Sequence, residues 1–205
     1  MTPKFLYFDL GRVLVNFSVE RMLDQMAAVA GITADAVREA VFAQGLMQQH
    51  ETGRISAREF CEAFGKATGT RVDFERLREA ATDIFEVNDP VLSVVAQLQQ
   101  AGYPMGILSN TCDLHWEHCV RRYRVVELGF RVYALSQRIG AMKPDAAIYQ
   151  AAAKLAGYAP EEIFFVDDTA GHVEGAKAIG FDAVQFTTAE ALADDLRHRG
   201  VRFNY

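Results

Sequence analysis

Residues 5–12 of this 205-residue chain have the sequence FLYFDLGR, an apolar run that ends in an aspartate. The run from Phe5 to Phe8 is continuous rather than alternating, which predicts a strand buried on both faces of a parallel sheet. Asp9 then lies at the carboxyl end of this strand, where open parallel sheets bind their ligands. Gly11 occupies the position two residues further on, where a second acid would complete a nucleophile and general-acid pair. We therefore expect Asp9 to take part directly in a reaction, and we expect Gly11 to limit that reaction because it has no side chain to donate a proton.

Four more continuous apolar runs predict further strands of the same sheet: Pro104 to Leu108, Val132 to Leu135, Ile163 to Val166 and Ala183 to Phe186. Helical patterns accompany the later runs: Asp89 to Ala101, Pro144 to Ala156, Gly171 to Gly180 and Ala189 to Arg197. Strands that alternate with helices predict an α/β fold, a Rossmann-like three-layer core with a parallel sheet covered on both faces.

The segment between the first strand and Asp89 breaks this alternation. It has no convincing strand from Val19 to Val87, and four helices fit it: Val19 to Ala30, Thr33 to Gln44, Ser56 to Thr68 and Asp73 to Val87. The sequence Ser56-Ala57-Arg58-Glu59 predicts a capping box at the start of the third helix. We expect an inserted all-α, four-helix cap domain at residues 16–88, and a core made of residues 1–15 and 89–205.

Composition excludes several classes of function. The net charge of -6 gives no broad attraction to nucleic acid or to an anionic membrane. No apolar stretch approaches the roughly 18 residues of a membrane span. The three cysteines form an odd, unpatterned set without a signal peptide, which is typical of a reducing compartment. We expect a soluble cytoplasmic protein, a monomer or weak homodimer, whose partner is a small molecule.

Polar residues follow four of the predicted strands, and each has an ordinary explanation as a cap or a solvated loop. They are Asp9, then Ser109-Asn110-Thr111, then Lys143, then Asp167-Asp168. Together they are harder to explain structurally, because three carboxylates at one sheet edge repel each other unless cations compensate them. Lys143 supplies one positive charge, and a hard dication such as Mg²⁺ would supply two more. A phosphate that bridges metal and lysine then becomes a natural ligand.

These segments carry a family resemblance over essentially the whole chain. FDLGRVL around Asp9, LSNT around Ser109, Lys143-Pro144 and FVDD ending at Asp168 resemble, in order and spacing, the four motifs of the haloacid dehalogenase-like (HAD) hydrolase superfamily. The helical insertion resembles that superfamily's type 1 α-helical cap. The phrases HETGRIS from His50 and YALSQ from Tyr133 are most similar to the branch around bacterial α-D-glucose-1-phosphate phosphatase.

The resemblance implies a Mg²⁺-dependent phosphatase acting on a small phosphorylated metabolite, such as a sugar phosphate. In that case Asp9 would be the nucleophile that forms an aspartyl-phosphate. Metal ligands would be Asp9, the carbonyl of Gly11, and Asp168 with help from Asp167. Ser109 and Asn110 would bind phosphate oxygens, and Lys143 would stabilise charge in the transition state.

Gly11 departs from the pattern, because phosphatases of this superfamily commonly carry the general acid there. Arg12 and the cap residues His50 and Glu51 are candidate stand-ins, and they are also candidate substrate-binding residues. The alternative for His50 and Glu51 is a solvated loop that turns at Gly53. We expect that Gly11→Asp restores the acid and helps most with poor leaving groups.

Two other functions remain open from the sequence. A 2-haloacid dehalogenase also attacks through an aspartate, and a departing halide needs no proton, so Gly11 suits it. The acidic pair Asp167-Asp168 argues against it, because dehalogenation requires no metal. A catalytically weak protein that binds phosphate or a partner is the third possibility.

Overall fold

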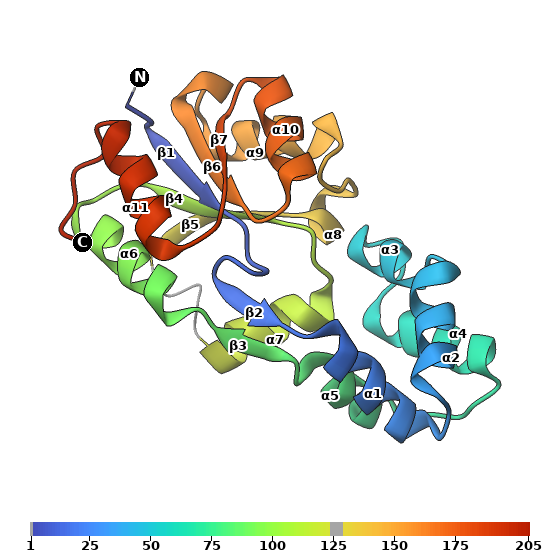
Figure 1. Cartoon of the computed structure of the whole chain (residues 1–205). Helices are drawn as coiled ribbons and strands as arrows, with labels where there is room; N and C mark the ends of the chain where they lie inside the picture. Colours follow the sequence, from blue (N-terminus) through green and yellow to red (C-terminus); the bar gives the residue numbers. More distant parts are fainter. Residues whose placement is uncertain (1, 124–128) are drawn as a thin grey trace.

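The structure is a computed structural model that describes residues 2–123 and 129–205. Its centre is a five-stranded sheet of order β5-β4-β1-β6-β7, in which every neighbouring pair is parallel. The strands are β1 (Phe5–Phe8), β4 (Met105–Ser109), β5 (Phe130–Leu135), β6 (Ile163–Asp167) and β7 (Asp182–Gln185). All five strands expected from the sequence are therefore present, and the predicted α/β class is confirmed (Figure 1).

Helices cover both faces of this sheet because alternate residues of its strands point to opposite sides. Leu6 and Phe8 of β1 pack into a cluster shared with α6 (Asp89–Gln100) and α11 (Ala189–His198). Phe5 and Tyr7 pack into a second cluster with α9 (Ala146–Ala156) and α10 (Ala170–Ile179). Burial on both sides explains why β1 is apolar throughout.

The chain between β1 and α6 forms a separate helical lobe beside the sheet (Figure 1). Its helices are α1 (Val19–Ala30), α2 (Ala34–Arg38) with a π-helical continuation (Glu39–Ala43), α3 (Leu46–Glu51), α4 (Ala57–Thr68) and α5 (Phe74–Thr82). The capping box at Ser56 and Glu59 is present. The expectation of four helices is wrong by one, because the helix expected at Thr33 to Gln44 ends at Ala43 and a further helix, α3, begins after Gly45. Gly45 has a φ of 70°, a backbone conformation that favours glycine and separates the two helices.

A two-stranded antiparallel ribbon joins this cap to the core. It pairs β2 (Val15–Phe17) with β3 (Phe85–Val87). The expected helix from Asp73 to Val87 is therefore wrong in its last third, and so is the expectation of no strand from Val19 to Val87. Phe85 and Val87 are aromatic and β-branched residues, which favour a strand once a partner strand is available. The expected domain boundaries at residues 15/16 and 88/89 fall at this ribbon.

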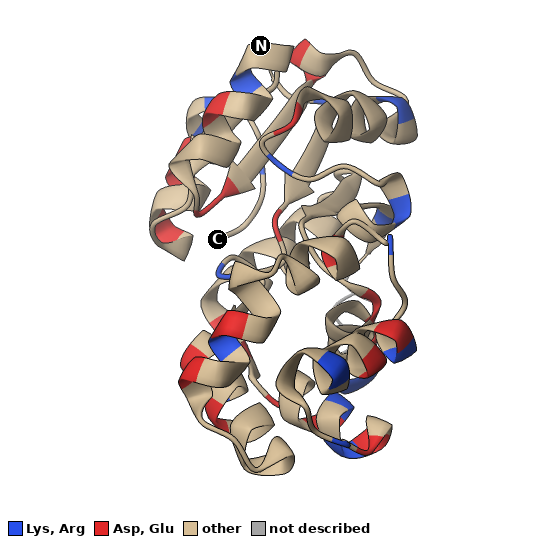
Figure 2. Cartoon of the chain, turned by 90° about the vertical axis from the view of Figure 1, so that its right-hand side faces the viewer, with Lys and Arg blue, Asp and Glu red and all other residues tan. Residues whose placement is uncertain are grey.

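Charged residues are distributed over both lobes. Lys and Arg residues are interspersed with Asp and Glu residues along the helices in the view of Figure 2. Within the described ranges, no helix combines the length and the apolar character that crossing a membrane requires.

Candidate active site

Asp9 lies where β1 ends and is 6% exposed. Its backbone amide donates to the carbonyl of Val166 on the neighbouring β6, at 3.0 Å, which extends the sheet pairing by one residue. The amide of Leu10 donates to Asp9 Oδ1 at 2.7 Å, so the side chain is fixed against its own turn. Lys143 contacts the same carboxylate, with its Nζ 2.9 Å from Asp9 Oδ1.

Lys143 is buried between the ends of three strands. Its Nζ contacts Asp9, donates to Asp167 Oδ2 at 2.5 Å and donates to the carbonyl of Leu108 at 3.1 Å. An ammonium has three N–H donors, so these three acceptors use all of them. Burial alone would lower the pKa of Lys143, but attraction by Asp9 and Asp167 outweighs it and holds the pKa above its ordinary value. Lys143 is therefore charged in the folded protein.

The protonation of Asp9 depends on opposing effects. Burial raises the pKa of Asp9 to about 6, with a further contribution from the charge of Asp167. Lys143 and a hydrogen bond with Ser109 act in the opposite direction. A nearby dication would favour the carboxylate form. The nucleophilic form of Asp9 thus depends on positive charge at the site.

Asp167 and Asp168 at the end of β6 have different surroundings. Asp167 is fully buried, and its two oxygens contact Lys143, the Thr169 amide at 2.8 Å, and His172 Nδ1 at 3.0 and 3.1 Å. Burial raises the pKa of Asp167, but the hydrogen bonds from His172 and Lys143 outweigh it and hold the pKa below its ordinary value. Asp168 contacts the Thr169 hydroxyl at 3.3 Å and Arg12 at 3.7 Å. Its carboxylate therefore has fewer and longer contacts than that of Asp167.

One oxygen from each of Asp9, Asp167 and Asp168 lies within 4.8 Å of the others. With Lys143 as the neighbouring cation, the group keeps an excess of negative charge, and its donors are all hard oxygens. This donor set fits Mg²⁺.

The segment after β4 holds the lysine loop in place. Asn110 Nδ2 donates to the carbonyl of Lys143 at 3.0 Å, and the amide of Lys143 donates to Asn110 Oδ1 at 2.8 Å. Both ends of the Asn110 amide are thereby engaged, so its side chain orders the loop of Lys143. Ser109 is 2% exposed and lies beside Asp9, with which it forms a hydrogen bond.

A cavity of about 120 Å³ lies between core and cap, and it is lined by Leu10 and Ser109, both neighbours of Asp9. Its core wall is formed by Leu10, Gly11, Ser109, Asn110, Thr111 and His115, and its cap and ribbon wall by Phe17, Val19, Met22, Phe42, Met47, Glu51, Ile84 and Phe85. The cap side of the wall is mainly apolar. Of the stand-ins considered from the sequence, Glu51 lines this cavity.

Arg12 and His50 have other positions. Arg12 is mostly exposed, with a guanidinium nitrogen 3.7 Å from Asp168 and its Cζ 5.4 Å from the centre of the Phe17 ring. His50 is 2% exposed and lies in α3, so the alternative of a solvated loop is wrong for it. The burial follows from an ion pair with a residue that sequence reasoning missed, Asp113.

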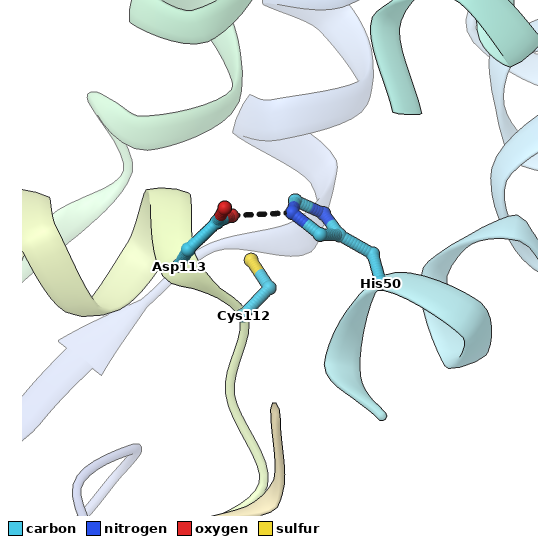
Figure 3. A group of neighbouring side chains, drawn as sticks. All are labelled: His50, Cys112 and Asp113. Atoms are coloured by element: carbon cyan, nitrogen blue, oxygen red, sulfur yellow. Dashed lines mark hydrogen bonds and ion pairs between the residues drawn. The ribbon is translucent and has the colours of Figure 1, made fainter. Parts of the chain in front are cut away.

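Asp113 begins α7 (Asp113–Tyr123) on the core side, and its carboxylate faces the cap (Figure 3). Its Oδ1 lies 2.5 Å from His50 Nε2, and its Oδ2 accepts from the amide of Ala57 at the start of α4. Cys112 lies beside this pair, and the ring of Phe60 stacks on His50 with centroids 4.9 Å apart. The pair therefore ties α3 and α4 of the cap to α7 of the core.

The space beside Gly11 is filled. A Cβ added at Gly11 would lie 2.8 Å from Cε1 of Phe17, which is closer than real Cβ contacts allow. Phe17 belongs to β2 and pairs with Phe85, so the ribbon holds it there. The Phe17 ring thus occupies the space that the side chain of an acid at position 11 would enter.

Known proteins share this architecture and sequence. The chain is 26% identical over 189 residues to a D-ribitol-5-phosphate phosphatase of Bacteroides thetaiotaomicron, covering 89% of this chain and 91% of that protein. It is 27% identical over 122 residues to an (S)-2-haloacid dehalogenase of Pseudomonas putida, covering 60% of this chain and 53% of that one.

A solved HAD family enzyme of Bacteroides thetaiotaomicron, in complex with magnesium and inorganic phosphate, superposes with a TM-score of 0.81. It is 27% identical and covers 91% of this chain and 95% of that chain. The family model for haloacid dehalogenase-like hydrolases matches residues 7–180, which include Asp9, Ser109, Lys143 and Asp168. The expected membership and the expected hydrolase class are confirmed: the chain belongs to the haloacid dehalogenase-like hydrolase family.

Proposed function

We propose that this protein is a Mg²⁺-dependent phosphatase that hydrolyses a small phosphomonoester through an aspartyl-phosphate at Asp9. One observation carries the proposal: a buried Asp9–Lys143–Asp167 cluster lies at the end of the sheet, and Asp168, whose contacts are longer, lies beside it. Such a cluster is costly to bury unless it serves a ligand that completes its charge balance.

The metal would be held by Asp9, Asp168 and the carbonyl of Gly11, with Asp167 in support. Asp167 would act mainly by orienting its neighbours, because its oxygens contact Lys143, His172 and the Thr169 amide. When bound, Mg²⁺ supplies positive charge that lowers the cost of bringing an anionic phosphate to an anionic nucleophile.

The other roles follow from position. Asp9 attacks phosphorus, and Lys143 stabilises the charge that spreads over the phosphate oxygens. Ser109 binds a phosphate oxygen, and Asn110 keeps Lys143 in place through its two hydrogen bonds to that residue's backbone. Arg12 beside Asp168 offers a further positive charge at the rim.

A sugar or sugar-alcohol phosphate is the substrate class that these observations support. The curated relative acts on D-ribitol 5-phosphate, and the cavity of about 120 Å³ suits a small molecule. A substrate such as glucose 1-phosphate fits this class.

A 2-haloacid dehalogenase is the second candidate, favoured by Gly11, by the apolar cavity wall and by the partial match to the Pseudomonas putida enzyme. Dehalogenation requires no metal, so it would not explain the carboxylate cluster around Asp168. Halide release from a 2-haloacid that is unaffected by EDTA would support this candidate.

The test is phosphate release from p-nitrophenyl phosphate and a panel of sugar phosphates, with Mg²⁺ and with EDTA. We expect turnover that requires Mg²⁺ and that Asp9→Asn abolishes. Asp24→Asn, the same change at an exposed position of α1, is the matched control and should retain full activity. Turnover that survives in Asp9→Asn would refute the role of Asp9, and a protein without turnover that still binds Mg²⁺ would be a binding protein.

A further inference from the structure

The proposed reaction has an unmet requirement, which is a proton for the departing alkoxide of a sugar phosphate. The usual position for its donor is closed here, because Phe17 lies 2.8 Å from where the Cβ of residue 11 would be. A side chain that donates this proton would then lie elsewhere on the wall of the cavity next to Asp9. Because only phosphate ester hydrolysis creates this requirement, a donor at the cavity rests on the proposed phosphatase function.

Among the described residues that line this cavity, the titratable side chains are Glu51 and His115. His115 is poorly suited to donate. Burial lowers its pKa, so its ring is neutral, and its Nε2 lies 3.2 Å from the carbonyl of Ala81. A carbonyl accepts only, so Nε2 carries the single proton and that proton is engaged.

Glu51 has the opposite properties. Burial raises its pKa, with His115 and Lys143 opposing the rise, so the carboxyl keeps its proton to a higher pH than a free glutamate does. No hydrogen bond or ion pair engages its side chain in the part of the chain that the structure describes, which leaves its proton available. Lys143 is near enough for its charge to act on Glu51, and Glu51 lines the cavity together with Gly11 and Ser109.

The position of Glu51 is fixed from the cap side. It is the last residue of α3, directly after His50, whose imidazole is paired with Asp113 of the core (Figure 3). The turn after α3 also lies against the core, because a Cβ on Gly53 would be 2.2 Å from the carbonyl oxygen of Gln137. Glu51 is therefore held over the core by two contacts, one on each side in the sequence.

We propose that Glu51 is the catalytic proton donor that replaces the acid missing at Gly11. As Asp9 attacks phosphorus, the bond from phosphorus to the ester oxygen breaks, and that oxygen takes the proton of the Glu51 carboxyl and leaves as the alcohol. The Glu51 carboxylate then accepts a proton from the water that attacks the aspartyl-phosphate. The bond from phosphorus to Asp9 breaks, inorganic phosphate departs, and both side chains return to their starting forms.

The experiment compares kcat/KM of wild type and Glu51→Gln on two substrates, a sugar phosphate with a poor leaving group and p-nitrophenyl phosphate with a good one. This parameter reports the steps up to formation of the aspartyl-phosphate, where the leaving group departs. We expect Glu51→Gln to lose roughly 10²- to 10⁴-fold on the sugar phosphate and little on p-nitrophenyl phosphate. A burst of p-nitrophenolate should precede slow turnover, because the water step has lost its base.

Glu62→Gln, the same change at an exposed position of the cap helix α4, is the matched control and should behave as wild type on both substrates. Thermal unfolding of both variants checks that they fold. Equal losses of kcat/KM on the two substrates, or a change confined to KM, would overturn the role of Glu51. A wild type that releases phosphate from neither substrate would instead overturn the proposed function, and the inference with it.

Discussion

The ion pair between His50 and Asp113 should make the stability of the folded protein depend on pH. Burial disfavours the charged imidazole, but hydrogen bonds with Asp113 and Cys112 outweigh it and raise the pKa of His50 from 6.5 to about 9. At about 1.36 kcal/mol per pKa unit, this gap corresponds to about 3 kcal/mol of folding free energy. This free energy is an upper value, because the Asp113 side chain is 40% exposed and water screens its charge.

The sign follows from the raised pKa of the folded state. The stabilisation is fully present below pH 6.5 and is lost as the pH rises through about 9, where folded His50 also loses its proton. Urea unfolding of wild type and His50→Gln at pH values across this window measures it. We expect the free energy of unfolding of wild type to fall by up to about 3 kcal/mol more than that of His50→Gln.

His198→Gln is the control for this experiment, because His198 is exposed on α11 and should leave the wild-type pH dependence unchanged. If His50→Gln keeps the same fall in stability between pH 6.5 and about 9 as wild type, the fall belongs to other groups and the reasoning is refuted.

Two further predictions concern glycines at close approaches. The structure changes the expectation for Gly11→Asp: alone it should lose about 1–3 kcal/mol of stability and gain no activity, because its Cβ meets Phe17. Gly11→Asp with Phe17→Ala should raise kcat/KM on sugar phosphates above Phe17→Ala alone. A gain of activity from Gly11→Asp alone would contradict this reasoning. Gly53→Ala should lower both the urea midpoint and kcat, because its Cβ meets the carbonyl of Gln137. Gly69→Ala, with a similar φ of 68° and nothing within 4 Å, should cost only backbone strain, and equal effects of the two would refute the clash.

The sequence was informative where a local pattern is sufficient. The strand ends at Asp9, Ser109 and Asp168, and the loop that carries Lys143, were predicted. Continuous apolar runs mark strands buried on both faces, and parallel strands present their carboxyl ends at one edge. The structure places these four residues at that edge.

The ribbon of β2 and β3 could not be predicted in the same way. Each strand has three residues, and they pair across about seventy positions of sequence, so neither has a periodicity of its own. Val15, Phe17, Phe85 and Val87 were plausible as loop or helix until the partner strand was known. The position of Phe17 against Gly11 depends on this ribbon, so it could not be derived from the sequence either.

Asp113 was missed for a related reason. It follows Ser109 and Asn110 by a few residues and is an ordinary acid at the start of a helix. The helix macrodipole and capping are sufficient to explain an acid there. Its contact with His50 joins the two lobes through residues that lie 63 positions apart in the sequence. A signal of this kind appears only when the cap is placed on the core.

If Glu51 is the proton donor, docking of the cap on the core is coupled to catalysis. An acid at position 11 and a phenyl ring at position 17 compete for one space, so a chain with Gly11 and Phe17 has no acid at position 11 to donate a proton. A donor on the cap, such as Glu51, is in place only while α3 is docked. Loosening the cap at His50 or Gly53 should therefore lower kcat as well as raise KM, whereas a cap that served only to bind substrate would leave kcat unchanged.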